Sequence, residues 1–351
     1  MKTRVSPQPP NFAKGTATML ARTTNCRPAP VPGVTPRHRR AGFTLIEILV
    51  VIIVISLLLA LLVPAVGGAR RKVNEARVAT EIKNLEAAIT TFKGMHGMEP
   101  PSRMVIFTTA TDWNLPAAAP YKAIIRRMWP QFDFNMTGGQ GNAYPQSWGA
   151  PGATVQLKAG ECLLFFLGGV IDANSGNNAP QGFAKDPAHP FAPMSKTTNR
   201  EPPAFSDFDV GRIQDSDKNG MNEYFDSLPN QTNPYLYFSS YEGKGYRVTS
   251  ANCDLPLDGS GNYSLLQDVY RVANTSGGSP APPGTTPPAT PQGSQALPPQ
   301  KPQSFQIISP GYDGNYGLGG AYDPNQPNGA LSNPADYDNI TNFSSGRLFA
   351  Q

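Results

Sequence analysis

The sequence predicts an α+β fold in which one long N-terminal helix packs on a small antiparallel β-sheet. An apolar run over residues 43–63, followed by apolar residues at helical spacing, predicts the helix. Four later runs rich in β-branched and aromatic residues, with turn residues between them, predict the sheet. The 351 residues suit one or two domains, and 37 Pro with 34 Gly indicate a body with many loops.

The first 42 residues differ in composition from the rest of the chain. They are Pro-rich, lack an apolar pattern and carry eight Lys and Arg with no acid, which predicts a segment without stable structure. Of 29 Lys and Arg in all, 21 remain beyond it against 25 Asp and Glu. The basic balance therefore belongs to the first 42 residues, and no nucleic-acid partner is expected for the body.

The apolar run over residues 43–63 is long enough to cross a membrane as a helix, because 21 residues span roughly 30 Å. Glu47 lies inside this run. A carboxylate costs about 2.5 to 3.5 kcal/mol at the centre of a membrane helix and less near its end. A compensating partner for Glu47 is therefore expected.

Basic residues flank the run on both sides. Arg37, Arg39 and Arg40 precede it, and Arg70, Arg71 and Lys72 follow it. The local count is equal, so these residues alone do not set the orientation. The rest of the basic N-terminal segment favours a cytoplasmic N-terminus.

The stretch "GFTLIEILVVIIVISLLLALLVP", which follows a basic cluster, resembles the N-terminal signal of type IV pilins and of type II secretion pseudopilins. The resemblance implies that residues 1–42 are a leader, that a prepilin peptidase cuts between Gly42 and Phe43, and that Phe43 becomes N-methylated. Glu47 then takes the fifth mature position, where the family's glutamate meets the terminal amine of a neighbouring subunit. Pro64 takes the place of a helix-loosening proline. A plain signal anchor with an incidental glutamate is the alternative.

The helix is expected to continue beyond the membrane over residues 64–95. Apolar residues recur there at steps of four and three, which is one face of an amphipathic helix; they are Val78, Ile82, Leu85, Ile89 and Phe92. Pro64 and the pair Gly67-Gly68 predict a loosened joint between the two halves. Glycines and Pro100-Pro101 end the helix.

Residues 96–351 are predicted to form a soluble α+β body. The short apolar run 160–170 is read as a core helix turn, because it is too short for a second membrane span. Strands are predicted at 234–239, 245–249, 265–272 and 304–309. Residues 273–303 are rich in Pro, Ser, Gly and Gln, which predicts a disordered insertion within the sheet domain.

The loop 215–226 has the spacing of an EF-hand-like calcium loop. Its oxygen-bearing side chains are Asp215, Asp217, Asn219, Glu223 and Asp226, with Asp226 in the twelfth position, where a bidentate Glu is usual. The flanking segments do not read as the two helices of an EF-hand. A hydrophilic turn with local side-chain to backbone bonds is the alternative.

A second acidic pattern joins "GYDGNYGLGG" (311–320) to "ADYDNITNF" (335–343). It resembles the C-terminal segment of the major pseudopilin of type II secretion, in which such a loop folds around calcium. The resemblance implies Asp313, Asp336 and Asp338 as calcium ligands, with a structural turn as the alternative.

No recognisable catalytic motif is present, so an enzyme is not expected. His96 and His189 are scattered and have no evident Cys or acidic ligand pattern beside them. Cys162 and Cys253 remain beyond the leader, and a disulfide or two buried thiols are both open.

The resemblance implies a structural subunit of a type II secretion pseudopilus. Its expected partners are copies of itself, other pseudopilins, the prepilin peptidase, an inner-membrane assembly platform and membrane lipid. The expected location is the inner membrane as a single-pass protein, with the body in the periplasm or outside. A type IV pilus-type or surface-displayed adhesin or binding pilin is the alternative, and neighbouring genes for a secretion ATPase and a secretin would favour secretion.

Overall fold

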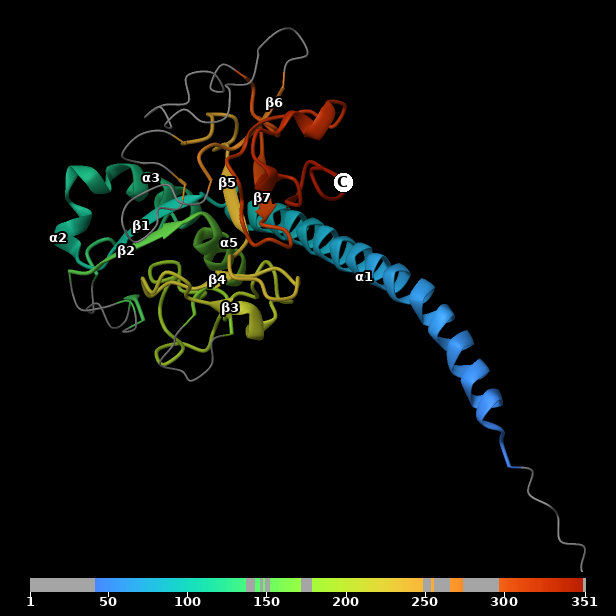
Figure 1. Ribbon diagram of the computed structural model, residues 1–351. Helices are drawn as coiled ribbons and strands as arrows, with labels where there is room; N and C mark the ends of the chain where they lie inside the picture. The colour runs from blue at the N-terminus through green and yellow to red at the C-terminus, as the bar shows by residue number, and fades with distance from the viewer. Residues whose placement is uncertain are drawn as a thin grey trace, which may run out of the picture. The chain divides into compact units, whose positions relative to one another are not determined.

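A computed structural model describes residues 42–136, 143–145, 148, 152–171, 179–248, 254–255, 266–273 and 297–349. The chain divides into two compact units, residues 1–60 and 61–351. The structure confirms the α+β class: a long N-terminal helix accompanies several small, mostly antiparallel sheets (Figure 1).

The helices form one long element and several short ones. In chain order they are α1 (Leu45–His96), α2 (Ala110–Trp113), η1 (Pro116–Ala118), α3 (Ala119–Met128), α5 (Ala159–Gly168), η4 (Val210–Arg212), η5 (Pro327–Ala330) and η6 (Pro334–Asp336).

The strands are all short. They are β1 (Arg103–Phe107), β2 (Thr154–Lys158), β3 (Ile213–Gln214), β4 (Glu223–Tyr224), β5 (Leu236–Ser239), β6 (Tyr270–Val272), β7 (Phe305–Ser309), β8 (Gly320–Tyr322) and β9 (Ile340–Thr341).

Helix α1 is continuous from Leu45 to His96, close to the expected 43–95. Helical geometry persists through Pro64 and Gly67-Gly68, so the structure shows no interruption where a loosened joint was predicted. By length and composition, α1 is the one helix among the described residues that could cross a membrane. The apolar residues of its first part are exposed, and Phe43, just before it, is 82% exposed.

The second part of α1 packs against the body through the predicted apolar stripe. All five stripe residues, from Val78 to Phe92, are buried. Phe92 meets Phe166 of α5 edge to face at 5.7 Å between ring centroids, a favourable geometry for aromatic rings. Every residue of α5 is buried, which confirms the core helix predicted from the run 160–170.

β7 is the central strand of the three-stranded sheet, and its five residues are all buried. β5 and β9 pair with β7 on its two sides, both antiparallel, with Tyr237 opposite Ile307. Figure 1 shows β5 and β7 side by side, with β1 and β2 as a separate antiparallel pair. The predicted strands at 234–239 and 304–309 are confirmed as β5 and β7.

Other predictions for the sheet need correction. No strand forms over residues 245–248. The chain turns there with positive φ at Tyr241, Glu242 and Gly245, and the Tyr246 hydroxyl donates to the carbonyl of Lys301 at 2.8 Å. Within the run predicted over 265–272, only β6 is a strand, and it pairs with β8 in parallel.

The prediction of disorder over residues 273–303 is wrong at its C-terminal end. Residues 274–296 lie outside the described residues, but residues 297–300 are bonded to β6. The Arg271 Nη1 donates to the Leu297 carbonyl at 3.0 Å, and Pro299 forms a β-bridge with Arg271. The run of Pro and Gln at its end is therefore held by backbone bonds that composition does not reveal.

Candidate functional site

The residues expected at the processing site lie just before α1. Gly42 and Phe43 precede the first helical residue, Leu45, in a segment without regular secondary structure. Both are exposed, as access by a peptidase requires.

Glu47 takes part in the N-terminal cap of α1. Its Oε2 accepts hydrogen bonds from the Thr44 amide at 2.7 Å and from the Thr44 hydroxyl at 2.9 Å. Thr44 Oγ1 accepts in turn from the Glu47 amide at 3.3 Å, so the pair forms a reciprocal capping box. Among the described residues, Glu47 is thus partnered by the neutral donors of Thr44 and forms no ion pair.

The first acidic loop gathers most of its predicted side chains. Asp215 Oδ1 and Asp217 Oδ1 both accept from the Asn219 amide, at 3.1 and 3.2 Å, and Asp215 Oδ2 accepts from the Gly220 amide at 2.9 Å. Glu223 Oε2 accepts from the amide of Ser216 at 3.0 Å. These are the local bonds of an acidic turn, and they hold the loop closed.

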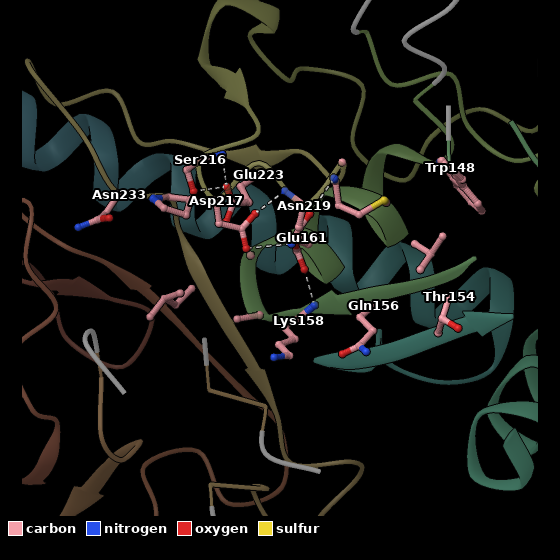
Figure 2. Close-up of a pocket in the computed structure, with 17 residues that line it drawn as sticks. Trp148, Thr154, Gln156, Lys158, Glu161, Ser216, Asp217, Asn219, Glu223 and Asn233 are labelled. Atoms are coloured by element: carbon pink, nitrogen blue, oxygen red, sulfur yellow. Dashed lines mark hydrogen bonds between the residues drawn. The ribbon is translucent and has the colours of Figure 1, made fainter. Parts of the chain in front are cut away.

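A residue that sequence reasoning missed completes this cluster. Glu161, in the first turn of α5, accepts from Asn219 Nδ2 at 2.5 Å and from the Lys158 amide at 2.7 Å. Figure 2 shows Glu161, Asn219, Asp217 and Glu223 converging on one pocket. The pocket encloses a volume of about 380 Å³ between α5, β2 and the loop. No sequence signal linked Glu161 to residues more than 50 positions away.

Burial and mutual repulsion raise the pKa values of the glutamates in this cluster. Burial, opposed by hydrogen bonds from Asn219 and the Lys158 amide, raises the pKa of Glu161 to about 8. Burial, with the charges of Asp217 and Asp215 adding to it, raises the pKa of Glu223 to about 7. Near neutral pH the folded protein therefore favours the protonated form of Glu161, and Glu223 is divided between its charged and protonated forms.

Asp226 does not join the loop, contrary to the twelfth-position assignment. Strand β4 carries the chain away after Glu223, and Asp226 is buried beside β7. Its Oδ2 accepts from the Ser309 hydroxyl at 2.5 Å and from Gln231 Nε2 at 2.9 Å, and its Oδ1 accepts from the Leu228 amide. Asp226 is therefore a structural acceptor that connects two loops to β7.

The second acidic pattern also comes together only in part. Asp338 Oδ2 accepts from the amides of Tyr312 at 2.6 Å and Asp313 at 3.1 Å, which brings the two predicted aspartates side by side. Asp338 Oδ1 is buried and has no hydrogen-bond partner within the described parts of the chain. An orphaned carboxylate oxygen beside a second aspartate suits a hard cation such as calcium.

Asp336 has a different role. Its Oδ1 accepts from the Gly319 amide at 2.9 Å and the Tyr270 hydroxyl at 2.7 Å, and its Oδ2 accepts from the Leu318 amide at 3.2 Å. Both oxygens are thus used to brace the glycine-rich loop. Across the described residues, no three His, Cys, Asp or Glu side chains are arranged to hold a metal ion. A calcium ion would need backbone or amide oxygens in addition to these carboxylates.

A polar hub that the sequence did not reveal fastens α1 to the body. Glu81 of α1 forms a two-pronged ion pair with Arg212, whose Nη1 lies 3.0 Å from Glu81 Oε2. The Tyr235 hydroxyl donates to Oε2 at 2.7 Å and the Tyr224 hydroxyl to Oε1 at 3.0 Å. The available sequence signal was the position of Glu81, one residue before Ile82 of the apolar stripe.

The cysteines and His189 have the following surroundings. Cys162 is a free, buried thiol, and Cys253 lies outside the described residues. His189 does have acidic neighbours, contrary to the sequence analysis. Its Nδ1 lies 2.9 Å from Asp186 Oδ2, and its Nε2 lies 3.7 Å from Asp133 Oδ2.

Comparisons with known proteins agree with the N-terminal segment. The family model of the prokaryotic N-terminal methylation motif matches residues 37–63. The type II secretion system core protein G of Klebsiella michiganensis is 32% identical over 95 residues, which cover 26% of this chain and 67% of that protein. The chain belongs to the type II secretion pseudopilin family.

Further relatives carry the same name. The core protein G of Pectobacterium carotovorum is 31% identical over 94 residues, or 26% of this pseudopilin and 60% of the relative. That of Klebsiella pneumoniae is 29% identical over 141 residues, or 39% of this chain and 91% of the relative. No solved structure matches the chain. The motif and the apolar helix indicate a membrane-anchored pseudopilin with a role in type II secretion.

Proposed function

We propose that this pseudopilin is a structural, non-catalytic subunit of a type II secretion pseudopilus. Subunits leave the inner membrane and assemble through α1 into a periplasmic filament that drives protein export. The methylation motif at residues 37–63 carries this proposal, together with the relatives named core protein G.

The first part of α1 supports a role in the filament core. Its apolar side chains are exposed within the single chain, and they need either lipid or other subunits to cover them. In an assembled filament, the apolar face of one helix would cover that of its neighbours. Other pseudopilins, an inner-membrane platform and the prepilin peptidase are the proposed partners.

Glu47 supports the same arrangement. Cleavage after Gly42 would create a charged amine at Phe43, close to the level of Glu47 in a neighbouring subunit. Opposite charges attract strongly where water is scarce, whereas a lone charge there is costly. The neutral capping bonds from Thr44 leave that charge available for a neighbour.

The processing step gives the most direct test. Gly42→Val places a branched side chain at the cleaved bond, and we expect the full precursor to accumulate in membranes. Mass spectrometry of the N-terminus should find methylated Phe43 in the unchanged protein and residue 1 in the variant. Gly67→Val, at a glycine of α1 beyond the motif, is the matched control and should be cut normally. An intact leader on the unchanged protein in cells that hold the peptidase would refute the proposal.

A further inference from the structure

Four basic residues follow the membrane-spanning part of α1 and form a feature that assembly does not explain. Between Ile48 and Ala69, 22 residues carry no charge, which as a helix is about 33 Å and slightly more than one hydrocarbon core. The next basic residues are Arg70, Arg71, Lys72 and Arg77, here called the basic belt. Their place along α1 corresponds to the level of lipid headgroups.

The acids closest to the belt along α1 are already paired inside the body. Glu75 Oε1 lies 3.0 Å from Arg347 Nε, and Glu81 forms an ion pair with Arg212 in the polar hub. In the described part of the chain, none of the four belt residues forms an ion pair with an Asp or Glu, and all four are exposed. The belt therefore presents four positive charges, without acidic partners in the described part of the chain, along about two turns of helix.

The body holds the belt in place through Tyr312. The Tyr312 hydroxyl donates to the Arg71 carbonyl at 3.0 Å, and the Arg71 guanidinium lies 5.0 Å from the ring centroid. Asp313, the neighbouring acid, is engaged by the Asn315 amide at 2.7 Å within its own loop. Tyrosine beside arginine is a pairing typical of the membrane–water interface.

We propose that the basic belt binds the headgroups of anionic phospholipids, which rests on the proposed function as a membrane-anchored pseudopilin. Arginine offers two parallel N–H donors to a phosphate, and several positive charges at one level favour anionic lipid over zwitterionic lipid. Lipid held at the belt would fix the depth of the subunit in the membrane until it enters the filament.

The test compares lipid retention by two charge-matched variants of the full chain. The belt variant is Arg70→Gln/Arg71→Gln/Lys72→Gln. The control variant, Lys83→Gln/Lys185→Gln/Lys196→Gln, removes three exposed positive charges elsewhere on unit 2. Each protein is placed in nanodiscs of phosphatidylcholine with a minor share of phosphatidylglycerol, and native mass spectrometry measures the phosphatidylglycerol that stays bound.

We expect the belt variant to lose phosphatidylglycerol enrichment by roughly tenfold or more, because each interfacial charge contributes about a fivefold factor. The control variant should match the unchanged protein. Equal enrichment in the two variants would overturn the proposal. So would a belt variant that keeps its lipid and loses subunit crosslinks, because the belt would then be a contact between subunits.

The outcome can be separated from that of the proposed function. Cleavage at Phe43 and recovery in membranes are measured on the same preparations, and neither depends on headgroup binding. A belt variant that is cut, anchored and depleted of anionic lipid supports both proposals. Loss of cleavage in every variant would count against the proposed function. The phosphatidylglycerol bound in nanodiscs would still decide whether the belt binds anionic lipid.

Discussion

Single carboxylates have three different fates in this pseudopilin, and their surroundings decide which. Glu47 is exposed and capped by Thr44. Glu81 is balanced by Arg212 inside the body. Glu161 is buried beside other acids and is disfavoured in its charged form, so its pKa rises to about 8. The same functional group is therefore an exposed helix cap, which we propose as an assembly contact, a partner in a buried ion pair, and a buried acid with a raised pKa.

The acidic cluster predicts a pH-dependent stability. The folded-state pKa values of Glu161 and Glu223, about 8 and 7, exceed the ordinary value of 4.5. The folded state therefore holds these protons more tightly than the unfolded state does. Their contribution to the free energy of unfolding is full below about pH 4.5 and is lost as pH rises toward 8, by up to about 1.4 kcal/mol per pH unit for each group.

Glu161→Gln should flatten this dependence, because the amide does not titrate. Urea unfolding of the chain in detergent, followed by tryptophan fluorescence in the presence of a chelator, measures the free energy at each pH. Glu201→Gln, at a glutamate outside the cluster, is the matched control and should keep the slope of the unchanged protein. Parallel curves for Glu161→Gln and the unchanged protein would show that Glu161 does not carry the effect.

Glu47 predicts a defect that is specific to assembly. Glu47→Val removes the carboxylate that a neighbouring amine needs, and it also lowers the cost of membrane insertion. We expect membrane levels to persist or rise while crosslinks between subunits fall severalfold. Ser56→Val, a polar to apolar change in the same apolar segment, controls for added hydrophobicity. Undiminished crosslinking of the valine variant would contradict the pairing of Glu47 with the amine of Phe43.

At the scale of elements, the two parts of α1 have different surfaces. Its first part exposes apolar side chains, and its second part buries a stripe against α5 and the sheets. Burial of the apolar stripe stabilises this contact without fixing its direction. The hub at Glu81 adds direction, because its four groups meet in only one register of the helix.

Removing one partner of the hub should weaken the attachment of α1. Burial alone would lower the pKa of Arg212, but the hydrogen bond and charge of Glu81 raise it overall, so the guanidinium stays charged. Glu81→Ala leaves that charge half-buried without its partner, and we expect the free energy of unfolding to fall by about 3 kcal/mol.

A double substitution distinguishes the lost pair from lost packing. Glu81→Ala/Arg212→Ala should be less destabilised than the sum of the single changes, since no unpaired charge remains. Lys83→Ala, at an exposed position two residues along α1, is the control and should change stability by under about 0.5 kcal/mol. Urea unfolding in detergent measures all four proteins, and additive single effects would argue against a coupled hub.

At the scale of the whole molecule, the features predicted correctly are those that depend on periodicity or on a local motif. The helix α1, its buried stripe, the core helix α5 and the strands β5 and β7 follow from patterns of apolar residues. The family was predicted from 23 residues around Glu47.

Features that depend on distant contacts were not predicted. Strands β1 and β2 are separated by 46 residues, and β3, β4 and β9 have two residues each, which is too short for an alternating pattern to be recognised. The parallel pairing of β6 and β8 follows from the path of the chain between them. The hub at Glu81 and the place of Glu161 beside Asn219 join residues that are far apart in sequence, and no spacing rule relates them.

Calcium binding remains a prediction, and the structure now distinguishes the two loops. Where Asp313 and Asp338 meet, one buried oxygen of Asp338 has no donor among the described residues. In the loop that holds Asp217 and Glu223, the carboxylates accept amide hydrogens, and Glu223 favours its protonated form. We therefore expect the site of Asp313 and Asp338 to bind calcium more tightly than the loop of Asp217 and Glu223.

Bound calcium would stabilise the folded chain, because the unfolded chain does not assemble the site. The gain is about 2.7 kcal/mol at a hundredfold excess of calcium over Kd, and magnesium should substitute poorly because it demands a tighter octahedral shell. Thermal melts of the chain in detergent, with calcium or with chelator, measure the shift in Tm. Asp338→Asn should abolish most of it and Asp217→Asn should leave most of it. Identical melting temperatures with calcium and chelator would mean that both loops are ordinary turns, held closed by the amide bonds already present.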